Sequence, residues 1–364
     1  MTEVAQFEPE WFSPPGEAVA EKLRSSGRPL DEFAFEMDLD EERVQRLFEG
    51  QLEITEYVAQ RLEKVFGVSA SFWLTREAQY RRDMRRIAES VPKDEAKTWL
   101  RTLPLKDMET RGWIVTQSDP IDRLAECFRY FDVPSIPSFD RRVSDLVGAV
   151  KLRTSDTLKS DPIALATWIR KGEIEAEHAP CGVWNAETFQ QSFDEIRKLT
   201  LIRDPNAFLP TLKHLCAASG VALVIAKGTT GCKASGATKF INKDKALLLL
   251  SFRHLSDDHF WFSFFHECGH LILHGKDQVF VEGEPHDTEL HEKEANEFAE
   301  KTLIPDPWFR LLDKLSPNRK DVIRFAVRVG VSPGIIVGQL QHRKRINHGY
   351  LNYLKRRFEW RANP

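Results

Sequence analysis

The sequence predicts an α+β protein that is mainly helical, and three observations support this class. Apolar residues recur at helical spacing through most of the first 205 residues. Residues 221–225 (VALVI) and 246–250 (ALLLL) are short apolar runs bounded by polar or turn residues, as buried strands are. Residues 261–274 read as a helix that carries a His-Glu-x-x-His pattern. We therefore expect a helical N-terminal part, followed by a domain in which a small sheet accompanies a histidine-bearing helix.

Length and composition are typical of a globular protein with more than one domain. The chain has 364 residues, of which 41% are hydrophobic and 29% charged, and this length suits two or three domains. No stretch approaches the roughly 18 to 20 consecutive apolar residues of a membrane span, and the first residues lack a signal-peptide pattern. The five cysteines are scattered without paired spacing. We therefore expect reduced thiols, a cytoplasmic location and no membrane partner.

Charge is distributed unevenly along the chain. Residues 1–80 contain 17 acidic and 8 basic side chains, whereas residues 311–364 contain 12 basic and 3 acidic ones. These two ends can attract each other, or the basic end can face an anionic partner.

Two short helices are predicted near the N-terminus. Residues 30–37 carry apolar side chains on one helical face, and a break at residues 38–40 follows. Asp40 is a suitable N-cap for a second helix over residues 41–48, which ends at Gly50. Two helices joined by a short turn are the outline of a helix-turn-helix.

This region resembles the Xre/Cro repressor-like domain of HigA-type antitoxins over roughly residues 10–80. The resemblance is carried by PPGE at residues 14–17, the helix pair, and LEKVFGVSASFWL at residues 62–74. It implies a Cro/repressor-like helical fold that binds DNA, and the side chains that could reach bases are Arg43, Gln45 and Arg46.

The charge of this region argues against DNA binding. A DNA-binding surface must neutralise phosphates, but residues 1–80 are acidic overall and the second helix begins with Asp-Glu-Glu at residues 40–42. The alternative is a fold that serves only dimerisation or regulation. Dimerisation through this region would make the protein a homodimer.

Residues 81–205 are predicted to form a helical connecting region. A helix that includes residues 163–169 is expected to end near Gly172. Another helix, over residues 208–219, then precedes the first predicted strand.

The candidate chemistry lies in residues 266–270, which read His-Glu-Cys-Gly-His. On a helix, His266 and His270 are one turn apart and project from the same face, so both imidazoles can reach one cation at about 2.0 to 2.1 Å. Glu267 lies beside them, where it can take a proton as a general base. The arrangement is typical of a zinc peptidase site, in which zinc acidifies water and polarises the scissile carbonyl. The alternative is a helix with two core or solvated histidines.

A catalytic zinc needs three protein ligands and an open fourth position, so a third ligand is expected downstream. In residues 291–303, the apolar positions 295, 298, 299 and 303 define the buried face of a helix. Glu292 lies about 45° from the centre of that face and Glu294 about 115° from it, at roughly 100° per residue. Glu292 is therefore the better ligand. Asn296, one turn later, can orient a ligand through a hydrogen bond.

The same residues resemble the ImmA/IrrE family of metallopeptidases. The similarity lies in HECGH at residues 266–270, the ExxANxFA pattern at residues 292–299 and LIP at residues 303–305. The run DDHFWF at residues 257–262 resembles the branch of that family fused behind a HigA-like domain.

The ImmA/IrrE resemblance implies a zincin-like peptidase domain, which we place at residues 206–310. It implies zinc at His266, His270 and Glu292, with Glu267 as the general base. It also implies cleavage of a specific protein partner, such as a repressor or antitoxin encoded nearby, in stress response or toxin-antitoxin regulation.

Three further residues near this motif admit a functional or a structural interpretation. Cys268, two residues after His266, points away from the metal on a helix, so we expect it to pack in the core. His274 continues the face of His270, but the ligand set is complete without it. His259 is a candidate donor to the oxyanion of a tetrahedral intermediate, with an ordinary structural histidine as the alternative.

Residues 311–364 are predicted to be a basic helical C-terminal segment. Within it, residues 321–340 read as a helix, a break at Gly330, a Ser-Pro start and a second helix. We expect this hairpin to close the preceding domain, although its outline also repeats that of a helix-turn-helix.

Two functions therefore compete. The first is a zinc endopeptidase, and the second is a HigA-like DNA-binding regulator or antitoxin whose metal site is structural or vestigial.

Overall fold

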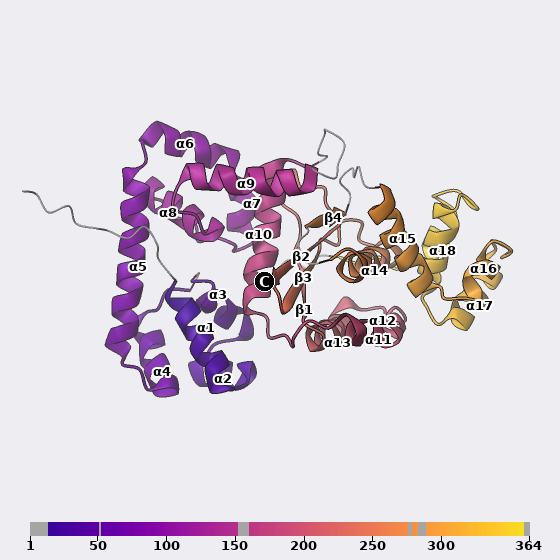
Figure 1. Ribbon diagram of the computed structural model, residues 1–364, viewed down its shortest axis with the longest axis horizontal. Helices are drawn as coiled ribbons and strands as arrows, with labels where there is room; N and C mark the ends of the chain where they lie inside the picture. The colour runs from indigo at the N-terminus through magenta and orange to yellow at the C-terminus, as the bar shows by residue number, and fades with distance from the viewer. Residues whose placement is uncertain (1–13, 51, 152–159, 276–278, 283–288, 360–364) are drawn as a thin grey trace, which may run out of the picture. The chain divides into compact units, whose positions relative to one another are not determined.

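The computed structural model describes residues 14–50, 52–151, 160–275, 279–282 and 289–359. The chain divides into two compact units, Met1–Val143 and Ser144–Pro364. Figure 1 shows helices in both units, and the labelled strands lie in the second. Many helices with one small sheet confirm the prediction of a mainly helical α+β protein. Among the described residues, no helix has both the length and the apolar character needed to cross a membrane.

The first unit is built from helices in its described part. They are α1 (Pro15–Ser26), α2 (Leu30–Met37), α3 (Glu41–Phe48), α4 (Glu56–Phe66), α5 (Ala70–Ser90), α6 (Lys93–Thr102), α7 (Leu105–Thr110) and α8 (Pro120–Phe131). The next helix, α9 (Ile136–Lys151), spans the boundary between the units.

The helices α2 and α3 confirm the two helices predicted at residues 30–37 and 41–48. Asp38 ends α2 in the left-handed conformation, and the Asp40 side chain caps α3 by accepting a hydrogen bond of 2.7 Å from the Arg43 backbone N–H. Phe33, Leu47 and other apolar residues of these helices form one core with α1, α4 and the start of α5.

The second unit contains the sheet and ten further helices in its described part. The helices are α10 (Pro162–His178), α11 (Ala186–Gln191), α12 (Phe193–Leu199), α13 (Pro205–Ala218), α14 (Asp257–Leu273), α15 (Glu289–Leu303), α16 (Trp308–Leu312), α17 (Arg319–Val329), α18 (Pro333–His342) and the short 3₁₀-helix η1 (Asn352–Leu354). The strands are β1 (Val221–Ile225), β2 (Gly236–Asn242), β3 (Lys245–Leu250) and β4 (Phe280–Glu282).

The four strands form one mixed sheet in the order β1-β3-β2-β4. The two predicted strands, β1 and β3, pair in parallel, and β2 pairs antiparallel with both β3 and the edge strand β4. The strands β2 and β4 were not predicted from the sequence. The β2 sequence, GATKFIN, mixes polar with apolar residues, and its residues become less buried toward its C-terminal end. The β4 strand has only three residues, which are too few to show a periodic pattern.

One face of the sheet packs against α10. A β-carbon at Gly172 would lie 2.7 Å from a methyl group of Leu249 and 3.1 Å from one of Leu247, so the missing side chain lets α10 approach β3. The expectation that this helix ends near Gly172 was wrong, since α10 continues to His178. Close packing, rather than termination, accounts for this glycine.

The other face packs against α14. Successive side chains of a strand point to opposite faces, so Leu248 and Leu250 of β3 face away from α10 and share a core with Trp261 and Phe264 of α14. The hairpin of α17 and α18 joins the same core, for example through Ile336. The helices predicted at residues 321–340 are thus confirmed, with Gly330 in the left-handed conformation between them.

Candidate metal centre

Two histidines of α14 lie with their side chains facing one another. His266 and His270 are one helical turn apart, and the sheet and α15 cover both imidazoles, which are 2% and 0% exposed. Their Nε2 atoms are 3.0 Å apart. Burial of two polar rings at this distance requires a proton or a cation between them, because two unprotonated nitrogens would repel each other.

Glu292 brings a carboxylate to the same point from α15. Ala295, Ala299 and Leu303 are buried as the sequence predicted, and they hold this helix on α14. One Glu292 oxygen lies 3.1 Å from His270 Nε2 and the other 3.4 Å from His266 Nε2. The structure therefore assembles the three predicted ligands, His266, His270 and Glu292, around one point.

The spacing of these atoms fits a tetrahedral cation. Ligands bound at about 2.0 to 2.1 Å in tetrahedral geometry lie about 3.3 Å from each other. The two Nε2 atoms are 3.0 Å apart, and the two Glu292 oxygens lie 3.1 and 3.4 Å from His270 Nε2 and His266 Nε2, respectively. Two imidazole nitrogens and a carboxylate are a donor set that zinc accepts, with room for a fourth ligand. Their geometry and chemistry therefore suit a metal ion.

Electrostatics link the same three groups. Although burial opposes it, the hydrogen bond with Glu292 raises the pKa of His266 to about 9. Burial lowers the pKa of His270 to about 3. Despite its own burial, the Glu292 carboxyl has a pKa below its ordinary value, since both histidines hydrogen-bond to it. The three groups therefore favour positive charge at this point, which a bound metal cation would supply.

Glu267 points from α14 toward the sheet and is completely buried. By strict geometry neither of its carboxylate oxygens accepts a hydrogen bond from a described residue, although the Thr238 hydroxyl lies near enough to act on its pKa. Burial raises the pKa of this carboxyl well above its ordinary value. A buried carboxylate with so little hydrogen bonding is costly, and such groups concentrate at reactive sites.

The strands β2 and β4 supply the wall opposite α14. Residues paired across neighbouring strands share a face, and the pairs Gly236 with Glu282 and Thr238 with Phe280 lie on the side toward α14. The Phe280 ring stacks on His270 with centroids 4.2 Å apart. Gly236 leaves space for Glu267.

Glu282 is a residue of this site that was not predicted from the sequence. Burial raises the pKa of its carboxyl, and the charges of His266 and Glu292 also act on it. Glu282 reaches the candidate metal centre because β4 pairs with β2 in the register that sets it opposite Gly236. The pattern Phe-Val-Glu at residues 280–282 carries no signal strong enough to predict that pairing.

The predicted neighbours of the ligands lie at different distances from them. Asn296 Oδ1 lies 3.0 Å from His266 Nδ1, on the side of the ring away from Glu292. Cys268 is fully buried in the core, as expected. His274 lies beyond His270, with their Nδ1 atoms 2.9 Å apart.

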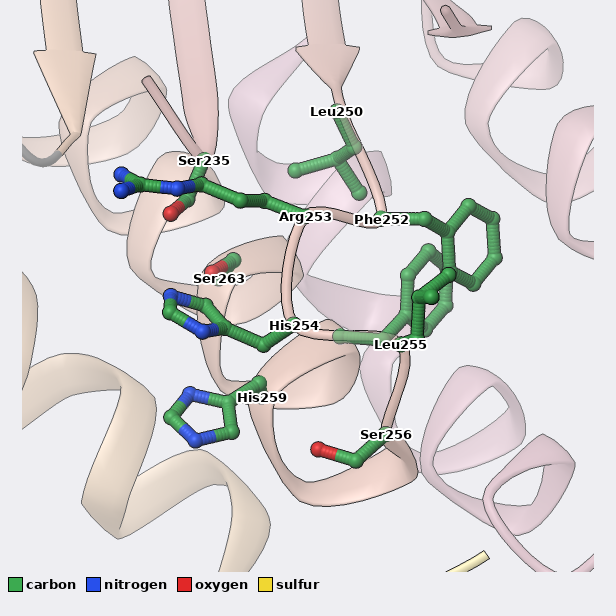
Figure 2. A pocket seen from close by; sticks show the side chains of 10 residues that line it. Ser235, Leu250, Phe252, Arg253, His254, Leu255, Ser256, His259 and Ser263 are labelled. Carbon is green, nitrogen blue, oxygen red and sulfur yellow. The ribbon is translucent and has the colours of Figure 1, made fainter. Parts of the chain in front are cut away.

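His259 lies elsewhere on α14. It precedes His266 by seven residues, or about 10 Å along the helix axis, and its side chain is 52% exposed. Figure 2 shows its ring beside that of His254 in a pocket also lined by Ser235, Arg253 and Ser263. The two rings stack with centroids 4.3 Å apart.

The three candidate DNA contacts of α3 differ in their surroundings. Arg43 is exposed. The Gln45 side chain donates a hydrogen bond of 3.1 Å to the side chain of Glu49, the residue that follows α3. Arg46 is partly buried, and its Nε atom is inaccessible to solvent.

Comparison with known protein families gives one match. The model of the peptidase M78 family, described as the IrrE N-terminal-like domain, matches residues 233–341. No curated protein and no solved structure matches the chain. The matched stretch excludes residues 10–80, so their likeness to a repressor domain stays a prediction. It runs from just before β2 to α18 and contains His266, Glu267, His270 and Glu292. Residues 233–341 are therefore similar to the IrrE N-terminal-like domain of peptidase M78, which indicates a metallopeptidase-like function.

Proposed function

We propose that the protein is a zinc-dependent endopeptidase that cleaves one specific protein, a repressor or antitoxin. The observation that carries the proposal is the convergence of His266, His270 and Glu292 at separations of 3.0 to 3.4 Å, next to the fully buried Glu267 carboxyl. The family match to residues 233–341 supports the same activity.

In this proposal, His266, His270 and Glu292 hold the metal. Bound zinc supplies a Lewis acid for the scissile carbonyl and lowers the pKa of water. Glu267 accepts a proton from the attacking water while the water oxygen bonds to the carbonyl carbon. It then passes that proton to the amide nitrogen as the C–N bond breaks. Glu267 directly follows the ligand His266 and is completely buried, so its carboxyl lies next to the place where the attacking water would be held.

Limited access to the centre supports a narrow substrate range. Both ligand imidazoles are almost completely buried, and Glu292 is only 22% exposed. Neighbouring segments must admit a peptide in an extended conformation before its carbonyl can reach these atoms. A partner that docks on the surface can contribute binding energy for that step, whereas an arbitrary peptide cannot.

The alternative is a HigA-like DNA-binding regulator with a structural metal site, and the surroundings of α3 do not favour it. Of its three candidate base contacts, Gln45 is engaged with Glu49 and Arg46 is partly buried. A salt-dependent gel shift on the protein's own promoter would support the alternative. Absence of a shift at low salt would remove it.

Metal content and one variant test the proposed activity. Protein purified without chelator should contain about one zinc per chain, and His266→Ala, His270→Ala and Glu292→Ala should lose it. The product of the neighbouring regulator gene should be cut by the wild type and not by Glu267→Gln, which should keep its zinc. Metal-free wild-type protein, or undiminished cleavage by Glu267→Gln, would overturn the proposal.

A further inference from the structure

A second group of polar side chains lies beside the metal centre. His274, which caps the C-terminal end of α14, lies with His291 and Glu294 of α15 so that one ligand atom from each falls within 4.8 Å of the others. The chemistry proposed above uses none of the three.

His274 connects this group to the centre through two contacts. Its Nδ1 atom lies 2.9 Å from His270 Nδ1, and its Nε2 atom lies 3.0 Å from a carboxylate oxygen of Glu294. The His274 side chain is 2% exposed, whereas that of Glu294 is 45% exposed. A chain of hydrogen-bonding groups therefore runs from His270 through a buried ring to a carboxylate at the surface.

Counting protons fixes the direction of the first hydrogen bond. A neutral histidine that binds a metal through Nε2 carries its proton on Nδ1. His270 faces Glu292 through Nε2, so its Nδ1–H must donate toward His274. The Nδ1 atom of His274 then accepts.

The same count fixes the second hydrogen bond. Neutral His274, which accepts at Nδ1, carries its own proton on Nε2. That N–H donates to the Glu294 carboxylate, 3.0 Å away. The donor and acceptor assignments of His270, His274 and Glu294 are therefore mutually consistent.

We propose that His274 and Glu294 are positioning residues, which hold the His270 ring in the orientation and tautomer that bind the metal. Asn296 is placed to do the same for His266, since its side-chain oxygen lies 3.0 Å from His266 Nδ1. Hydrogen-bond acceptors behind metal-bound histidines orient the rings and raise their basicity. This inference rests on metal binding by His266, His270 and Glu292.

A second cation on His274, His291 and Glu294 is the competing use of these atoms. Such a cation needs a lone pair on His274 Nε2, but the hydrogen bond from this nitrogen to Glu294 requires a proton there. Filling the first site therefore disfavours filling the second. His291 distinguishes the two uses. It would be a ligand of the second cation, but it forms neither of the two hydrogen bonds of His274, although the two rings lie 4.3 Å apart.

Zinc affinity of four variants of the full-length protein tests the proposal, measured by competition with a chromogenic chelator. His274→Ala should raise the zinc dissociation constant about 10- to 100-fold. His274→Asn should recover most of that loss, because its side-chain oxygen can accept where Nδ1 did. Glu294→Ala should cause a smaller rise, since water can replace an exposed carboxylate. His291→Ala, the matched control, should bind one zinc with unchanged affinity.

The cobalt-substituted protein gives a second readout that is independent of activity. The visible absorption of bound Co²⁺ should change in His274→Ala, return toward wild type in His274→Asn and remain unchanged in His291→Ala. Wild-type affinity in His274→Ala would overturn the inference, as would two equivalents of zinc in wild type reduced to one by His291→Ala. Failure of the wild type to bind zinc would instead refute the proposed function.

Discussion

Gly236 at the start of β2 lies directly against Glu267 of α14. A β-carbon at position 236 would lie 2.5 Å from Glu267 Oε1 and 2.8 Å from its Cγ, closer than side-chain carbons approach other atoms. The absence of a side chain on the strand therefore determines where the candidate general base can lie.

Gly236→Ala should move the Glu267 carboxyl and reduce cleavage without removing the metal. A displacement of about 1 Å can cost a catalytic group 10²-fold in rate, and the three atoms nearest the added methyl group all belong to Glu267 rather than to a metal ligand. We expect a loss of about that size, with zinc content unchanged. The rate of cleavage of the regulator and the zinc content are the measurements.

Gly148→Ala is the matched control for Gly236→Ala. Among the described residues, no atom beyond the chain neighbours and the backbone of α9 lies within 4 Å of a β-carbon at position 148, which is part of this helix. Alanine in a helix is favoured over glycine by roughly 0.5 to 1 kcal/mol, so cleavage should persist and stability should not fall. Equal activity of both variants would contradict the role given to the Gly236 contact.

Removal of the metal should lower the melting temperature. A ligand at 1,000 times its dissociation constant stabilises the folded state by about 4 kcal/mol, which corresponds to roughly 10 °C for a unit of 150 to 250 residues. Differential scanning fluorimetry with and without EDTA, followed by excess zinc, measures the effect. His266→Ala is the control and should not respond to EDTA. A similar response in that variant would show that the chelator acts at another site.

Local signals explain which parts of the fold could be predicted. The start of α3 could be predicted because Asp40 is a residue type that favours the N-cap position, where its side chain accepts a hydrogen bond from a nearby backbone N–H. Glu292 could be placed because the buried face of α15 repeats at helical spacing, with Ala295 and Ala299 fully buried.

Contacts distant in sequence explain what could not be predicted. Gly172 reads as a helix end until its approach to Leu247 and Leu249 is known. Glu282 reaches the centre only through the pairing of β4 with β2, and no local pattern determines that pairing. The role proposed for His274 depends on Glu294 one helix away, a residue that the helical projection placed far from the ligand face.

The five cysteines should differ in their reaction with iodoacetamide in the native protein. Burial raises the pKa of the Cys127, Cys216 and Cys268 thiols, and all three are inaccessible. Since the thiolate is the reactive form, these should be alkylated only after unfolding. Burial also raises the pKa of the Cys181 thiol, but Cys181 and Cys232 are partly exposed and should react before the three buried cysteines. Mass spectrometry of peptides measures each site, and stoichiometric native labelling of Cys268 would contradict its placement in the core.

Lys355→Ala should destabilise the protein through the start of α14. Lys355 Nζ lies 2.6 Å from Asp258 Oδ2, and both side chains are more than nine-tenths buried. The other oxygen, Asp258 Oδ1, has no hydrogen-bond partner among the described residues, so removal of the lysine leaves a buried carboxylate with little compensation. Loss of one partner of a buried pair typically costs about 3 to 5 kcal/mol.

Urea unfolding of three variants separates this effect from a general loss of charge. Lys301→Ala breaks an exposed pair with Glu297 in the same unit, where the side chains are 62% and 48% exposed, and should cost at most about 1 kcal/mol. The double variant Asp258→Asn/Lys355→Met should be more stable than Lys355→Ala, because it no longer buries an unpaired charge. If Lys355→Ala and Lys301→Ala unfold at the same urea concentration, the buried pair does not hold the N-terminal end of α14 in place.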